Sequence, residues 1–202
     1  MNKVTIGFCI VILLGTLFVF SNIEKNMGDV AATTETKDNE NREILSAKLI
    51  TYRFDDAVRR ADLIVEIIIQ EHLEDITHPA PKTIFSAKVS SILSGETDVK
   101  NIKIMQQGNQ EVSINGNALF SKEEKYILFL KNVGEDSQYS PDTYWILGEE
   151  TNIYKVIDNN TIKKIALNDS LLNEIEIKDN DQFSQLLDKE LFEEKVEMII
   201  SR

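Results

Sequence analysis

The sequence predicts a mainly β domain, of α+β composition, with helices near its two ends. Between residues 63 and 166, apolar and polar residues alternate in several short runs, and turn-forming residues follow each run closely. Toward the C-terminus the apolar spacing changes to that of an α-helix, about 3.6 residues. About six or seven short antiparallel strands joined by such close turns favour a small barrel or a curled sheet.

A short helix is predicted at the start of the domain, which begins near Glu43. In YRFDDAVRRA, residues 52 to 61, four apolar side chains are spaced to share one helical face, and two aspartates near the start complement the helix dipole. The predicted buried face consists of Phe54, Ala57, Val58 and Ala61.

Two strands follow, separated by a loop at residues 77 to 82 that contains two prolines. In ADLIVEIIIQEH, residues 61 to 72, one side is apolar and the other mixes isoleucine with Glu66 and Gln70, so the second face is expected to be partly covered. In TIFSAKVSSIL, residues 83 to 93, regular alternation predicts one face in water. The predicted buried positions are Leu63, Val65, Ile67, Ile69, Phe85, Ala87, Val89 and Leu93.

Five further strands are predicted. EKYILFLK is apolar on both faces and is therefore the predicted central strand. DNN, residues 158 to 160, is a natural hairpin turn between the last two strands. The five segments are NIKIMQQG, EKYILFLK, TYWILG, NIYKVI and TIKKIA.

The C-terminal segments DSLLNEI and DQFSQLLDKELFEEKVEMIIS are predicted helices, with Asp181 as the N-cap of the longer one. Two apolar stripes on the longer helix are rotated from each other, which implies a bend or packing on two sides. The VEMII portion is also available for docking a partner. The stripes are Phe183, Leu186, Leu187 and Leu191, and Phe192, Val196, Ile199 and Ile200.

An apolar run without charge extends over residues 4–23. As a helix it would measure about 30 Å, the thickness of the hydrocarbon core of a bilayer. Lys3 precedes it, so the positive-inside rule places the C-terminal domain outside the cell. A single-pass anchor at residues 1–23 is favoured over two alternatives: a cleaved signal ending near residues 29–32, which would make the protein secreted, and lipidation of Cys9.

Composition limits what the rest of the chain does. Residues 24–42 are polar and predict a disordered tether ahead of a domain at residues 43–202. The formal charge of −12 would repel nucleic acid. The single cysteine lies in the apolar run, so the exported domain can form no intrachain disulfide and no cysteine-ligated metal site.

The order of several strands resembles a known domain type. ADLIVE, TIFSAKVSSILSGE, IKIMQQG, EEKYILFLK and YWILG follow one another as in exported or membrane-anchored proteins of Gram-positive bacteria. The resemblance covers about Phe54 to Ile157 and implies an OB-like, netrin-like β-barrel with no settled activity. SKEEKY replaces a glycine-containing turn, and the cysteine with which netrin-like inhibitors reach a metalloprotease metal is missing, so that mechanism is not implied.

Few residues are candidates for chemistry. His72 and His78 lie among Glu71, Glu74 and Asp75, but their spacing matches no standard zinc motif, which favours a solvated acidic loop over a metal site. The chain has no GxSxG motif and no glycine-rich phosphate loop. We therefore predict no catalytic residues, no cofactor or cofactor-binding residues and no metal ligands.

Aromatic residues on the strands offer a possible stacking surface of the kind that oligomer-binding barrels use. Their strand positions favour core packing instead, because large aromatics on alternating strands are mostly buried. These residues are Tyr126, Phe129, Tyr144, Trp145 and Tyr154.

The expected function is an extracytoplasmic binding module without catalytic activity, attached to the membrane through residues 4–23. Its expected partner is another protein or a cell-envelope component, and not nucleic acid. Two alternatives stay open: an envelope enzyme that uses an acidic or metal-binding loop at residues 71–78, and a membrane sensor domain.

Overall fold

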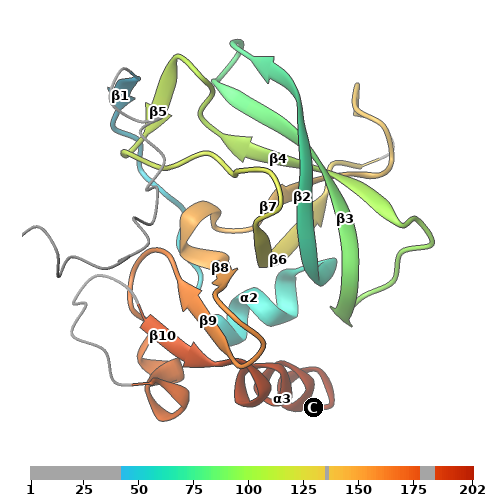
Figure 1. The fold of residues 1–202 in the computed structure, drawn as a ribbon, viewed down its shortest axis with the longest axis vertical. Coiled ribbons are helices and arrows are strands. Elements are labelled where there is room, and N and C mark those ends of the chain that lie inside the picture. Colours follow the sequence, from blue (N-terminus) through green and yellow to red (C-terminus); the bar gives the residue numbers. More distant parts are fainter. Residues whose placement is uncertain (1–41, 135–136, 178–184) are drawn as a thin grey trace, which may run out of the picture. The chain divides into compact units, whose positions relative to one another are not determined.

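A computed structural model describes residues 42–134, 137–177 and 185–202 of the chain (Figure 1). All of these residues belong to one unit, Asn39–Arg202. The predicted membrane segment at residues 4–23, and all but the last residue of the predicted tether, lie outside the described residues. Within the described ranges, no helix is long and apolar enough to cross a membrane.

The described part of the chain contains ten strands, two α-helices and two 3₁₀ helices. In chain order they are β1 (Glu43–Leu45), α2 (Phe54–Arg60), β2 (Leu63–Ile76), β3 (Lys82–Ser94), β4 (Asn101–Gln107), β5 (Val112–Ile114), β6 (Lys125–Asn132), β7 (Thr143–Ile146), η2 (Glu149–Asn152), β8 (Ile153–Val156), β9 (Thr161–Lys164), η3 (Ser170–Ile175), β10 (Gln185–Asp188) and α3 (Lys189–Ile200).

Five strands close into a barrel. β2, β3 and β4 are antiparallel neighbours, β6 pairs with β2, and β7 pairs with both β4 and β6. This closure confirms the predicted mainly β fold with a small OB-like barrel, a short helix before it and a helix at the C-terminus. The expected antiparallel arrangement is wrong for one pair, β4 and β7, which are parallel. β4 is antiparallel to β3, and β7 is antiparallel to β6. Because β3 and β6 are both antiparallel to β2, β4 and β7 run in the same direction.

The barrel encloses one of two hydrophobic cores. The alternation along β2 and β6 places Leu63, Val65 and Ile67 inside the barrel, as predicted, together with every second residue of β6. The remaining side chains of this core come from β3, β4, β7, β8 and the loop before β6. They include Phe85, Ala87, Ile102, Ile104, Phe120, Tyr144, Ile146 and Ile153.

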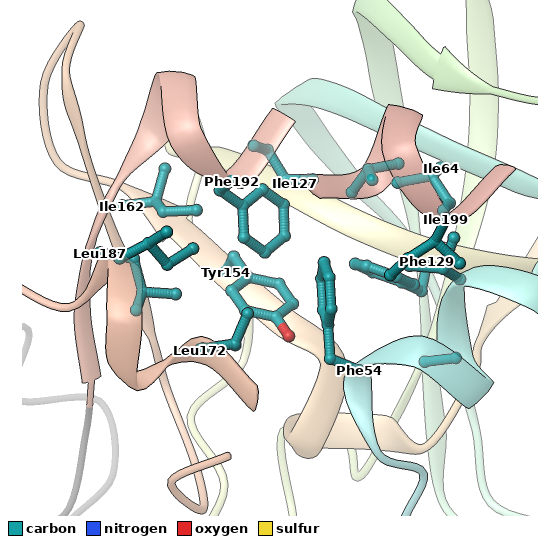
Figure 2. Packing of buried hydrophobic residues seen from close by; sticks show 14 of the residues in the cluster. Phe54, Ile64, Ile127, Phe129, Tyr154, Ile162, Leu172, Leu187, Phe192 and Ile199 are labelled. Atoms are coloured by element: carbon teal, nitrogen blue, oxygen red, sulfur yellow. The ribbon is translucent and has the colours of Figure 1, made fainter. Parts of the chain in front are cut away.

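The second core lies on the other side of β6. Here β8, β9 and β10 continue the sheet from β6, and α2 and α3 pack against it (Figure 1). Figure 2 shows Phe54 of α2 and Phe192 of α3 meeting Phe129 of β6 and Tyr154 of β8. The prediction that β6 is apolar on both faces because it is central is confirmed, since its alternate residues supply both cores. Phe54, Ala57 and Val58 of the predicted face of α2 are also buried, while Ala61 follows the helix as its C-cap and is only partly buried.

The predicted C-terminal helix is wrong over its first part. Residues 185–188 form β10, which pairs with β9, and α3 begins only at Lys189. Its N-cap is Asp188, whose side chain accepts a hydrogen bond from the amide of Leu191 at 3.0 Å. Asp181 and Phe183 lie outside the described residues. The two rotated stripes arise because Leu187 reaches the core from a strand and Phe192 reaches it from a helix.

Two details of the first hairpin also differ from expectation. The residues predicted as an acidic loop, 71 to 75, belong to β2, which continues to Ile76. Leu93 packs against the second core instead of the barrel interior. Register shifts between β2 and β3 near Ile64 and Glu66 change which side of the sheet the end of β3 faces.

An N-terminal contact was not predicted. β1 pairs in parallel with β5, and Arg42 just before it donates hydrogen bonds from its guanidinium to the backbone oxygens of Asn109, Val112 and Asn117, at 2.8 to 2.9 Å. These bonds attach the start of the domain to the loop that follows β4.

Candidate functional site

The predicted acidic segment forms a hydrogen-bond network centred on Asp75. His72 Nε2 and the Thr83 hydroxyl lie 2.8 and 2.9 Å from the Asp75 carboxylate, and the Gln110 amide lies 3.3 Å from it. Burial opposes ionisation of Asp75, but these hydrogen bonds together lower its pKa. The network connects the end of the β2–β3 hairpin to the loop after β4.

No metal centre is apparent in this segment. Asp75 and His72 bond to each other, and His78 lies beyond the strand in the loop before β3. Among the residues that the structure describes, no group of three or more histidine, cysteine, aspartate or glutamate side chains is placed to hold a metal ion.

The outer face of the barrel exposes one large aromatic side chain. Of the five aromatics predicted to lie in the core, Tyr126, Phe129, Tyr144 and Tyr154 are buried, but Trp145 is 45 % exposed. Tyr144 and Ile146 on either side of it point into the barrel, so alternation along β7 turns Trp145 outward. The prediction of core packing is wrong for Trp145 for this reason.

The neighbours of Trp145 combine apolar and basic groups. Met105 on β4 and Lys131 on β6 are its register partners, and Lys103 lies one outward position further along β4. Ile84 on β3 is the register partner of Met105. We call this surface the Trp145 face, and it consists of Ile84, Lys103, Met105, Lys131 and Trp145. Ile84 and Met105 are each only 5 % exposed, so a ligand would meet mainly Trp145 and the two lysines.

Both lysines of the Trp145 face are held by carboxylates. Lys131 pairs with Asp62, and Lys103 Nζ lies 3.6 Å from Asp142 and 2.6 Å from the hydroxyl of Ser140. The Ser140 hydrogen bond and the charge of Lys103 lower the pKa of Asp142 although burial opposes this. The two lysines come from the strands on either side of β7, and their side chains stay partly exposed.

A second group of titratable residues surrounds η2. Burial, with the neighbouring Glu150, raises the pKa of Glu149 to about 8, while Lys82 and Gln107 act in the opposite direction. Burial lowers the pKa of Lys164 to about 8, and its ammonium donates to the backbone oxygens of Thr151 and Ala166. Sequence reasoning missed this group because two adjacent glutamates usually mark a solvated turn, and their burial depends on tertiary contacts.

No protein-family model matches this chain, and no curated protein sequence matches it.

Changing Glu149 to glutamine is expected to flatten the pH dependence of stability. Because its folded pKa is raised from 4.5 to about 8, the folded state keeps a proton that the unfolded state releases between these values, so this stabilisation is complete below pH 4.5 and is lost as pH rises toward 8. Since the residue is half-buried, we expect a loss of only about 1–3 kcal/mol across this range. Urea unfolding at the two ends of the range measures it.

Glu111→Gln is the matched control for this measurement, because Glu111 is exposed and makes the same change of charge. It should keep the wild-type pH dependence. An identical pH dependence in wild type and Glu149→Gln would contradict the raised pKa.

Proposed function

We propose that this protein is an extracytoplasmic binding module without catalytic activity, anchored in the membrane through residues 4–23, whose Trp145 face binds a component of the cell envelope. The observation that carries the proposal is the exposure of Trp145 on an OB-like barrel. Removing the exposed apolar surface of the indole from water is favourable. A ligand that covers Trp145 would therefore gain binding free energy from this burial.

The chemistry of the Trp145 face favours a sugar-containing ligand with anionic groups. OB-like barrels bind oligosaccharides and oligonucleotides on an outer strand face, and the net charge of −12 disfavours the nucleic acid. The flat indole suits stacking, and Lys103 and Lys131 lie where negative groups of the same ligand would meet them.

Three of the described carboxylates are held by neighbouring side chains. Asp75 bonds to His72, Glu124 pairs with Lys155, and Glu66 lies 2.6 Å from Lys189. Hydrogen bonds lower the pKa of Asp75 and of Glu124 although burial opposes this, so these two carboxylates are poor general bases near neutral pH. The acidic segment at residues 71–78, proposed for the enzyme alternative, thus already has a structural use.

Trp145→Ala is expected to weaken binding of isolated envelope polysaccharide by about tenfold or more, because stacking on one aromatic contributes about 1–3 kcal/mol. Binding of the detergent-solubilised chain to the polysaccharide measures this. The unfolding midpoint should change little, since Trp145 is half in water.

Ile157→Ala removes a side chain of equal exposure from the β8–β9 turn and should bind as wild type does. Unchanged binding by Trp145→Ala would show that the Trp145 face is not the binding surface. Failure of the wild-type chain to bind any envelope fraction would reject the proposed function itself.

The membrane anchor has its own test. In cells that express a C-terminally tagged chain, we expect the tag in the membrane fraction, its removal by protease added outside, and an N-terminus that keeps residues 4–23. A mature chain that begins near Ala32 in the medium would show that the segment is a cleaved signal.

A further inference from the structure

A groove beside η2 has mostly apolar walls and one ionisable side chain. Its volume is about 460 Å³, within the range of small-molecule sites, and it lies between the N-terminal arm, the loop after β5 and the loop after β9. Leu49, Ile165 and Leu167 line it, and Asn117 lies at its polar end. Among the described residues that line the groove, Glu150 alone has an ionisable side chain.

Among the described residues, no other residue donates a hydrogen bond to the side-chain carboxyl of Glu150. It is 8 % exposed, and both carboxyl oxygens are buried without a donor within the part of the chain that the structure describes. Burial raises its pKa, and its own backbone N–H offsets this in part. A buried carboxyl without a donor is costly and uncommon, so it marks a position where a bound group would supply the missing donor.

The charged groups around Glu150 are engaged elsewhere. The ammonium of Lys164 donates to the backbone oxygens of Thr151 and Ala166, and the charge of Lys82 acts on Glu149. Glu149 in turn has hydrogen bonds from Gln107 and repels negative charge on Glu150. Among the described residues neither lysine therefore pairs with the Glu150 carboxyl, and a cationic ligand would supply the missing donor.

We propose that this groove binds a primary ammonium group on a short apolar stem, such as a lysine side chain, with Glu150 as the acceptor of the ammonium. The stem would lie against Leu49, Ile165 and Leu167, and the ammonium would donate to the two unpaired oxygens. The Asn117 side chain is not free for this role, because it bonds to the Gln107 oxygen and the Ile114 amide. The groove shares no residue with the Trp145 face, so either site can fail without the other.

Binding of the ligand ammonium to the Glu150 carboxyl changes the protonation equilibrium of this carboxyl. Without a ligand, burial raises the pKa of the Glu150 carboxyl, whereas a bound ammonium favours its ionised form, so a proton that the free carboxyl carries is released to the buffer on binding. Affinity should therefore rise with pH until the ammonium of the ligand itself loses its proton.

The test is calorimetric titration of the full chain in detergent with Nα-acetyl-lysine amide near neutral pH, in two buffers of different ionisation enthalpy. We expect saturable binding to one site with release of protons. Nα,Nε-diacetyl-lysine amide keeps the stem but has no charge, and it should bind at least about tenfold more weakly. Butylamine separates the two sources of this chemistry: equal affinity points to a free alkylamine, and weaker affinity points to a lysine in a polypeptide.

Glu150→Gln should bind Nα-acetyl-lysine amide about tenfold more weakly than wild type does. The variant should still fold, because the amide has the shape of the protonated carboxyl. Leu167→Lys, at a residue that is 57 % exposed, should weaken binding by placing an ammonium of the chain itself at the groove. Glu111→Gln should bind as wild type does. Absence of binding by the wild type, equal binding of the diacetylated compound, or undiminished binding by Glu150→Gln would each overturn the proposal.

Discussion

Replacing Phe192 with alanine should lower the free energy of unfolding by about 3–5 kcal/mol. The side chain is fully buried, and its ring centroid lies 5.2 Å from that of Phe54, 6.4 Å from that of Phe129 and 4.6 Å from that of Tyr154. Figure 2 shows how it fills the space between α2, α3 and the sheet. These three elements can relax only partly into the space left by an alanine, so most of the cavity would remain.

Leu191→Ala is the control in the same helical turn, because Leu191 is 43 % exposed. It should cost less than about 1 kcal/mol. Urea or thermal unfolding of both variants measures the difference. Equal losses would mean that α3 packs through its other face and that the second core is assigned wrongly.

Replacing Gly95 with alanine should cost about 2–5 kcal/mol. Gly95 turns the chain after β3 with a φ of +83°, a conformation that L-residues avoid. A Cβ there would lie 2.2 Å from the backbone oxygen of Asp62, well inside van der Waals contact. Relief would require movement of the start of β2, where the Asp62 amide donates to the oxygen of Leu130 at 2.8 Å.

Gly116→Ala separates the two causes of this loss. Gly116 has a similar φ of +79°, but a Cβ there would meet no atom within 4 Å. It should cost only the backbone term, about 1–2 kcal/mol. If both variants lose the same free energy, the contact with Asp62 contributes nothing.

The barrel could be predicted from local patterns because alternation reports burial directly. Leu63, Val65 and Ile67 face a core because every second residue of a strand points to the same side. EKYILFLK has apolar residues at every second position on both sides, and only a strand between two cores explains that pattern.

Other features depended on contacts that local patterns do not contain. β10 has the composition of a helix, but its pairing with β9 decides its conformation. Trp145 has an aromatic ring like its buried neighbours, and the direction of β7 relative to the barrel decides which of them faces water. The pairing of β1 with β5 joins residues about 70 positions apart and leaves no local signal.

The candidate sites were the least predictable part. Glu149 and Glu150 follow Gly148 in a turn, where glutamate is ordinary, and only the structure shows that Glu149 is half-buried and that Glu150 is buried beside an apolar groove. The segment at residues 71–78 contains two histidines and three carboxylates, and the structure uses His72 and Asp75 to join a hairpin to a loop. Residue type indicates which chemistry is possible, and the folded structure decides which buried polar groups lack a hydrogen-bond partner.

The sharing of β6 between the two cores has a consequence for how the molecule opens. The barrel cannot lose β6 without removing one wall of the second core, and α3 cannot separate without uncovering Ile127 and Phe129 on the same strand. The amide protons of β6 should therefore exchange with deuterium only when the whole domain unfolds, while those of β1, on a three-residue pairing at the periphery, should exchange through local fraying. One strand thus makes two cores into a single cooperative unit.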